Sequence, residues 1–472
     1  MDPSRRNWVL AAAAGMLVVC LCGVLVAGAT GGFLAALIGA RGPASSTTPS
    51  IPAATEAPAL PTKSPSQQAS PPTPAALSPQ IQAAMDQIQS QVAQLRGLKT
   101  TQPVERRLIT TSDLRTLVQS DFLKNYSKSQ AEDDARVYAL LGLVQPHFDL
   151  WDLYLNLYTE QVAGFYDDEK KVMFVVQGAG FQGPERLTYA HEYTHALQDQ
   201  HFDLNGKLGY NESSCETNSE RCSGIQSLVE GDATLLEDQW LRTYATDQEL
   251  AQIQSFYSTF ESPVFSSAPA FLQDEFTFPY TSGLTFVQSL YNKNGWASVD
   301  NAYGNVPVST EQIIHPDKYP SDTPILLTEP SNVASNLGAG WTQIDDGTMG
   351  ELFTREVFQA FLPDSTATTA AAGWGGDFYQ AYYDSSTDES AIVIVMAWDT
   401  IRDAQEAELA WRDYGDARFS DHSSSAGVVT WETSSGAAYL QRLSNQTLWI
   451  QAPDSSTVDQ IKKSVTFPAR KK

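Results

Sequence analysis

Near the middle of the chain, residues 187–201 read LTYAHEYTHALQDQH. His191 and His195 stand four positions apart. Four residues make about one turn of an α-helix, so both imidazoles project from one face. Two imidazoles in that arrangement can reach one zinc ion, and Glu192 beside them can act as a general base. We therefore expect His191 and His195 to be metal ligands and Glu192 to be catalytic.

Histidine is scarce in this chain, which makes the pattern informative. Only 6 of the 472 residues are histidine. Composition alone predicts this pattern about 0.01 times in a chain of this kind. The competing interpretation is two exposed histidines on a solvated helix face. The concentration of half the histidines in residues 191–201 of an apolar helix argues against it.

Zinc needs a third protein ligand and an open position for water. One candidate is His201, which occupies the third-histidine position of the metzincin pattern HExxHxxGxxH. That pattern needs a glycine where this chain has Gln198. If the helix continues, His201 lies about 120° from the ligand face. The other candidate is Glu230, beside the apolar face of a predicted helix, where a buried carboxylate needs a partner such as a metal. An exposed helix carboxylate is the alternative for Glu230.

The motif His191-Glu192-x-Thr194-His195-Ala196-x-x-Asp199 resembles that of the thermolysin-like gluzincins, a superfamily of HExxH zinc metallopeptidases. The resemblance covers residues 160–240. It implies a zincin-like fold, the zinc ligands His191, His195 and Glu230, and Glu192 as base. It also implies that Asp199 orients a ligand and that the strand Val172–Val176 is the edge strand that pairs with substrate.

The chain departs from that pattern at one place. Thermolysin-like enzymes have an aspartate four residues after the third ligand, and Thr234 stands there in this chain. Asp232 is the nearest candidate to replace that aspartate beside the ligands, although its side chain would face elsewhere on the helix.

A zinc peptidase also needs a donor for the developing oxyanion, usually a tyrosine or a histidine. The candidates are His315 and Tyr319 in a polar segment, and Tyr280 before a predicted helix. For each of them, a purely structural role is the alternative. Cys215 and Cys222 lie between the two ligand helices and are expected to form a small disulfide loop. A cysteine-based metal site is the weaker alternative.

The N-terminus is apolar, with no charged residue between Arg6 and Arg41. This run exceeds the ~20 residues that span a bilayer as a helix. It predicts a transmembrane signal-anchor at 8–40 with residues 1–7 in the cytoplasm and the body outside. A secreted form cleaved near Ala29 is the alternative.

Three further regions follow the predicted anchor. Residues 41–79 are rich in Pro, Ser and Thr, which indicates an extended linker. Residues 80–365 show helical periodicity and contain the motif, so we expect a helix-rich metallopeptidase domain with a small mixed sheet. Residues 366–472 alternate strand and helix patterns and predict a smaller α+β C-terminal domain.

The composition restricts the partners. The chain has 30 Lys and Arg against 55 Asp and Glu, a formal charge of −25, which argues against nucleic-acid binding. The interpretation is therefore an α+β, membrane-anchored, extracytoplasmic zinc metallopeptidase with a peptide or protein substrate, and an acidic rim favours basic or neutral peptides. The alternatives are an inactive zincin-fold surface binding protein and a metzincin-like peptidase that uses His201.

Overall fold

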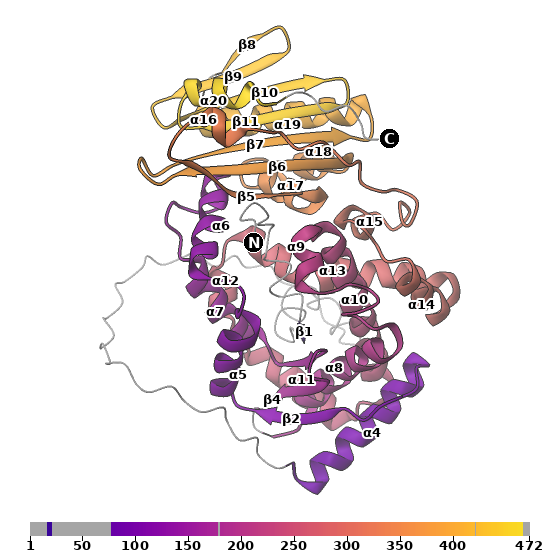
Figure 1. Cartoon of the computed structure of the whole chain (residues 1–472). Coiled ribbons are helices and arrows are strands. Elements are labelled where there is room, and N and C mark those ends of the chain that lie inside the picture. The colour runs from indigo at the N-terminus through magenta and orange to yellow at the C-terminus, as the bar shows by residue number, and fades with distance from the viewer. Residues whose placement is uncertain (1–16, 21–76, 178–179, 421, 466–472) are drawn as a thin grey trace, which may run out of the picture.

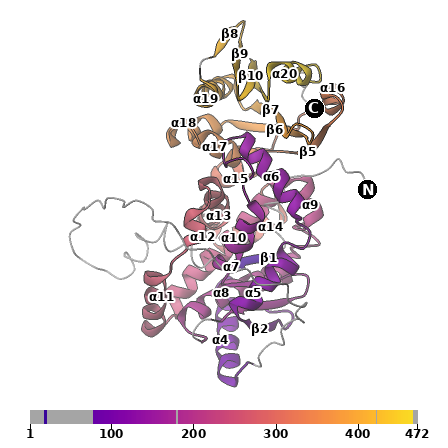
Figure 2. The same ribbon diagram turned by 90° about the vertical axis from the view of Figure 1, so that its left-hand side faces the viewer.

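The computed structural model describes residues 17–20, 77–177, 180–420 and 422–465. The fold is α+β: a helical body with a small sheet is followed by a layered unit built on a seven-stranded antiparallel sheet. The large sheet stacks on one end of the helical body, as two views show (Figures 1 and 2). One apolar core runs through both parts, and Tyr138 and Phe271 of the body contact Phe353 beneath the sheet.

The first half of the body alternates helices with the strands of the small sheet. Its elements are α4 (Pro79–Arg96), β2 (Glu105–Ile109), α5 (Thr111–Leu117), the π-helix η1 (Val118–Phe122), α6 (Lys128–Leu140), α7 (Leu150–Gln161), β3 (Gly164–Asp167) and β4 (Val172–Val176). Serine or threonine side chains cap α4, α5 and α6, and each accepts a bond from a backbone N–H of the first turn.

The second half of the body is helical. Its elements are α8 (Gly183–Phe202), α9 (Glu212–Thr217), α10 (Ser219–Tyr244), α11 (Asp247–Thr259), α12 (Pro263–Ser267), α13 (Ala270–Asn294), α14 (Trp296–Gly304) and α15 (Thr310–Ile314). The next helix, α16 (Val333–Leu337), packs in the core of the C-terminal unit. Helix α10 packs closely on α13, because Gly231 and Gly283 face one another. A Cβ at Gly231 would overlap the carbonyl oxygen of Gly283, so this approach requires glycine.

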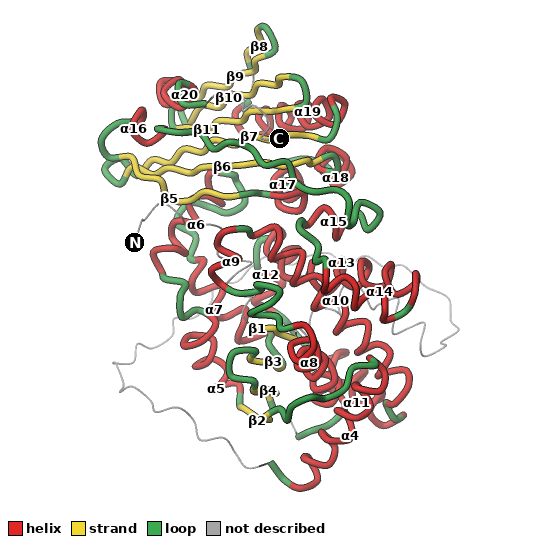
Figure 3. The backbone as a smooth tube through the Cα atoms, turned by 45° about the vertical axis from the view of Figure 1, so that its right-hand side comes forward, coloured by secondary structure: helices red, strands yellow, loops and turns green. Residues whose placement is uncertain are grey.

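The small sheet is mixed and has the order β1-β3-β4-β2, where β1 is Leu17–Cys20. Strand β4 lies between β3 and β2 (Figure 3). It runs parallel to β2 and antiparallel to β3. The predicted strand at Val172–Val176 therefore exists, but it lies inside the sheet and not at its edge. The tight turn after Asp167 causes this, because it pairs β3 with one side of β4 and leaves the other side for β2.

The predicted transmembrane anchor is wrong. In the part of the chain that the structure describes, no helix has the length and apolar character needed to cross a membrane. Within 8–40, the described residues Leu17–Cys20 form β1, whose backbone pairs with β3, and the β-branched Val18 and Val19 favour that conformation. Four extended residues span about 13 Å, short of a bilayer core. The prediction of a single-pass membrane location falls with the anchor. The remaining residues of 1–40, and most of the predicted linker, lie outside the described residues.

The C-terminal unit is a seven-stranded sheet with helices on both faces. Its elements are β5 (Trp341–Gly347), α17 (Gly350–Gln359), α18 (Asp364–Ala371), β6 (Trp374–Asp384), β7 (Glu389–Trp398), α19 (Ile401–Phe419), β8 (Ser423–Ser425), β9 (Val428–Thr433), β10 (Gly436–Leu443), β11 (Gln446–Ala452) and α20 (Ser455–Lys462). The strand order is β5-β6-β7-β11-β10-β9-β8, with every pair antiparallel. The sheet thus begins before residue 366, because β5 pairs with β6.

The central strand β7 explains the uninterrupted apolar run near residue 395. Ile392, Ile394 and Met396 belong to the core that includes α19, whereas Val393 and Val395 pack in the core that includes α20. Both faces of β7 are therefore buried, and a strand in that position has no polar alternation.

Candidate metal centre

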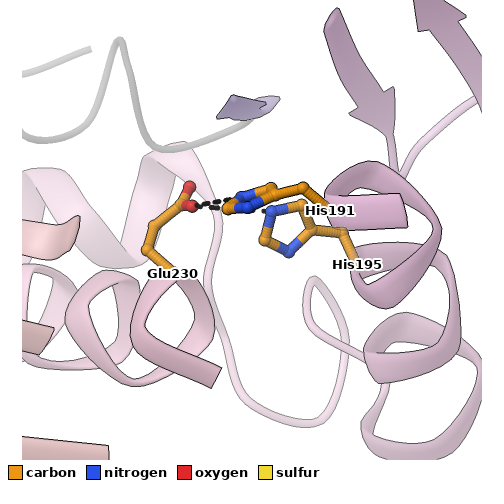
Figure 4. A group of neighbouring side chains, drawn as sticks. All are labelled: His191, His195 and Glu230. Atoms are coloured by element: carbon orange, nitrogen blue, oxygen red, sulfur yellow. Dashed lines mark hydrogen bonds and ion pairs between the residues drawn. The ribbon is translucent and has the colours of Figure 1, made fainter. Parts of the chain in front are cut away.

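The two histidines of the motif and Glu230 come together between α8 and α10 (Figure 4). All three side chains are buried. The Nε2 atom of His191 lies 3.2 Å from Oε2 of Glu230, and the Nε2 atom of His195 lies 3.5 Å from the same oxygen. The three ligand atoms lie within 4.8 Å of one another.

These separations can be tested against the geometry of a metal site. Ligands at about 2.0–2.1 Å from a tetrahedral zinc ion lie about 3.3 Å from each other. The two measured nitrogen–oxygen distances lie close to that value. The buried Nε2 atom of His195 has no hydrogen bond within the described part of the chain. A buried polar atom of this kind needs a partner, so these residues fit a zinc ion.

Two further side chains orient the histidines. Oε2 of Glu237 lies 2.8 Å from Nδ1 of His191, and Oε1 of Gln198 lies 2.8 Å from Nδ1 of His195. Gln198 also donates to the carbonyl of Val229, which links α8 to α10 at 3.0 Å. Because each Nδ1 donates its proton to these acceptors, each Nε2 faces the metal position. The sequence analysis missed both residues, although Glu237 follows Glu230 by two helical turns on the same face.

Asp199 and Asp232, which were expected to support the ligands, bond to other side chains. Asp199 accepts bonds from Tyr166 at 2.9 Å and from Lys171 at 2.6 Å, which ties α8 to the β3–β4 hairpin. Asp232 accepts two bonds from Arg96, at 2.8 and 3.0 Å, and one from Tyr303 at 2.7 Å. Neither aspartate contacts a candidate ligand through these bonds. Their charged partners, Lys171 and Arg96, are distant from them in the sequence.

The electrostatics of the candidate ligands reflect burial and shared charge. Burial lowers the pKa of His191, but hydrogen bonds to Glu230 and Glu237 outweigh it and raise that pKa well above its usual range. Burial is the main cause that lowers the pKa of His195. Burial raises the pKa of Glu230, yet the neighbouring histidines bring it below its usual value. Glu230 is therefore a carboxylate and His195 a neutral imidazole, which are the forms that bind metals.

Glu192 lies on the side of α8 that faces β3. A Cβ atom on Gly164, the first residue of β3, would lie 3.4 Å from Cγ of Glu192 and 2.7 Å from Cγ2 of Thr188. A side chain at Gly164 would overlap Thr188 and the carbonyl oxygen of Phe174, so glycine lets β3 pack closely on α8 beside Glu192. The carboxylate is fully buried, next to His191 in the sequence and between α8 and the small sheet.

The structure separates the three candidates for the oxyanion donor. Tyr280 on α13 is buried, and its ring centroid lies 6.3 Å from that of His191. His315 is bonded to Glu351 at 2.9 Å, and Tyr319 donates to the carbonyl of Asn305 at 2.6 Å. Tyr280 is therefore next to the candidate ligands, and the other two are engaged elsewhere.

A second tyrosine near the site was missed. Tyr210 follows α8 and is buried. Burial is the main cause that raises the pKa of its phenol, and the negative charge of the nearby Glu230 raises it further. No motif surrounds this residue, so only the folded chain reveals it.

The structure places the remaining predicted residues near the ends of the ligand helices. His201 lies in the last turn of α8, which continues to Phe202, and its Nε2 donates to the carbonyl of Lys99 at 2.7 Å. Cys215 and Cys222 form a disulfide between α9 and the start of α10, and both are buried. The disulfide therefore fixes the start of the helix that carries Glu230.

A second group of carboxylates is paired with a lysine side chain. Glu311, Asp322 and Asp399 lie close enough to one another to hold a metal. The Nζ atom of Lys318 lies 2.5 Å from Glu311 and 2.8 Å from Asp399. This ammonium group already neutralises the cluster, which therefore fits an internal ion-pair network.

The comparisons with known proteins reach only the C-terminal unit. Residues 338–462 match a domain family of unknown function, DUF8575. No curated protein and no solved structure matches the chain. The match includes the whole sheet from β5 to β11 and excludes every residue of the candidate metal centre. The C-terminal unit of this chain is thus similar to the domains of that family.

Proposed function

We propose that this protein is a zinc-dependent metallopeptidase, a hydrolase that cleaves peptide bonds with His191, His195 and Glu230 as ligands. The observation that carries the proposal is the convergence of the two Nε2 atoms on one carboxylate oxygen, with Nε2 of His195 lacking a hydrogen bond within the described chain. Few structural roles need that arrangement, because a histidine buried for stability has its nitrogens bonded.

The chemistry follows from the residue types. A zinc ion held by the three ligands would polarise the scissile carbonyl and make a water molecule more acidic. Glu192 takes a proton from the attacking water and passes it to the leaving amine. Tyr280 and Tyr210 are two buried tyrosines near the ligands and are our candidates for donation to the developing oxyanion. The formal charge of −25 favours basic or neutral peptides as substrates.

Two alternatives make different demands on the same residues. A zincin-fold binding protein without activity needs the ligands but has no use for Glu192, whose complete burial costs free energy. A metzincin-like site needs His201 as a ligand, and this imidazole is bonded to the carbonyl of Lys99. The peptidase proposal accounts for both Glu192 and Glu230.

The test combines bound metal with peptide cleavage. Purified protein is analysed for zinc by mass spectrometry and assayed on a mixed peptide library, with Glu192→Gln as the test and the exposed Glu261→Gln as the control. We expect Glu192→Gln to keep zinc and to lose about 10²–10⁴-fold in activity. Glu261→Gln should match the unaltered protein.

Two outcomes would overturn the proposal. Bound zinc with equal, negligible cleavage by the unaltered protein and Glu192→Gln would indicate a binding protein. Zinc retained after Glu230→Ala but lost after His201→Ala would move the third ligand to His201.

A further inference from the structure

A cleft lies between the start of α13 and the end of α17, where the helical body meets the C-terminal unit. It encloses about 360 Å³. Its lining combines apolar side chains, among them Leu143 and Phe271, with the carboxylates of Asp274, Glu356 and Asp364. None of these residues belongs to the candidate metal centre.

Glu356 is the unusual member of this lining. Its side chain is 2 % exposed, and neither carboxylate oxygen has a hydrogen-bond partner in the described part of the chain. A buried carboxyl group without a partner is costly to ionise, so it stays protonated until a cation approaches it. Asp274 and Asp364 are exposed, so the cleft has one carboxylate in its depth and two near its surface.

The side chains around Glu356 are mostly acidic. Burial, followed by the negative charges of Glu275 and Asp274, raises the pKa of Glu356 well above its usual range. Arg355 is the cation that acts in the opposite direction. The raised pKa means that Glu356 keeps its proton while the cleft is empty, and the single guanidinium of Arg355 does not balance the surrounding acids. A cationic ligand can take the place of that proton, so the ligand that fits the cleft is a cation.

The spacing of the acids decides which kind of cation fits. Among the described residues, the carboxylate groups of this cleft do not form a set of three oxygens within 4.8 Å, which a single metal ion would need. The apolar wall formed by Leu143, Ala270 and Phe271 suits an alkyl chain. We propose that the cleft binds a linear diamine or polyamine, with one ammonium group at Glu356 and a second near Asp274 and Asp364.

Isothermal titration calorimetry of the full-length protein in 0.15 M salt, a concentration of about physiological ionic strength, tests this site. The probes are putrescine, spermidine, butylamine and Mg²⁺. We expect putrescine or spermidine to bind with one-to-one stoichiometry and butylamine, with one charge, to bind at least about tenfold more weakly. Glu356→Gln should weaken diamine binding at least about tenfold, because glutamine keeps the shape but cannot lose a proton to become the partner of the ammonium group.

Asp274→Asn is the second variant, since its exposed position leaves folding intact, and it should reduce the preference for putrescine over butylamine. Asp459→Asn removes an exposed carboxylate from α20 and should leave binding unchanged. Absence of diamine binding, equal binding of butylamine, tighter binding of Mg²⁺ that Glu356→Gln abolishes, or undiminished binding by Glu356→Gln would each overturn the proposal. Zinc content and peptidase activity do not depend on this cleft, so its failure leaves the proposed function untouched.

Discussion

The start and the middle of α10 hold buried carboxylates in different ways. At the start of α10, Glu220 accepts bonds from the backbone N–H of Thr310 at 2.8 Å and from its hydroxyl at 2.9 Å. Ten residues further along, Glu230 faces two imidazole nitrogens, one of which has no hydrogen bond within the described chain. Backbone and hydroxyl donors complete a structural contact, whereas an uncommitted nitrogen leaves room for a ligand.

The largest effect is expected when a ligand nitrogen is removed from the candidate metal centre. We expect His195→Ala to lower zinc affinity by at least about 10³-fold, because only two ligands remain. Metal content after dialysis against a graded chelator measures this effect, and circular dichroism verifies that the helices persist. His201→Ala is the matched control and should bind zinc like the unaltered protein, since His201 bonds Lys99. Unchanged zinc binding by His195→Ala would contradict the assignment.

The position of Glu230 depends on the close approach of α10 to α13. Gly231→Ala places a methyl group against the backbone of Gly283, and neither helix can yield locally. We expect a loss of about 3 kcal/mol in the free energy of unfolding, measured by urea denaturation. Gly304→Ala is the control, because no atom lies within 4 Å of its added Cβ. Equal stability of the two variants would contradict the close packing of α10 on α13 at Gly231 and Gly283.

The groups that orient the histidines should matter less than the ligands themselves. Glu237→Gln weakens the hydrogen bond to Nδ1 of His191 without removing it. We expect zinc affinity to fall about 10–100-fold, or about 1.4–2.7 kcal/mol. Competition with a fluorescent zinc chelator measures the change, and Glu261→Gln serves as reference. An unaltered affinity would show that Glu237 does not orient the ligand.

The last prediction concerns the start of α10, where the effect depends on pH. Burial raises the pKa of Glu220 to about 8, although the bonds from Thr310 lower it. Because the folded pKa lies above that of the unfolded chain, this group stabilises the fold at low pH and loses that contribution as pH rises toward 8. Glu220→Gln cannot titrate. Relative to the unaltered protein, its free energy of unfolding should therefore rise between pH 5 and 8, by at most about 1.4 kcal/mol per pH unit. A constant difference across that range would contradict this assignment.

Several features of the fold and the site could be predicted because they depend on local spacing. The separation of His191 and His195 determines that they share a helix face, and the apolar flank of Glu230 indicates a buried carboxylate. The α+β class and the small mixed sheet also followed from local patterns.

The remaining features depend on contacts between distant segments. Gln198 and Glu237 reach the histidines only because α8 packs on α10, and Asp199 and Asp232 are neutralised by Lys171 and Arg96, which no local pattern reveals. Leu17–Cys20 fall within the predicted helix at 8–40 but form β1, and length and hydropathy alone do not distinguish a helix from a paired strand.

The double contact of α10 with one imidazole has a consequence for how metal is lost. Glu230 and Glu237 bond opposite nitrogens of His191 from positions about 10 Å apart along the helix axis. A screw motion of α10 by one residue would shift it by about 1.5 Å, rotate it by about 100° and break both bonds together. For the proposed zinc centre, we therefore expect metal release on heating to coincide with cooperative melting of the helical body.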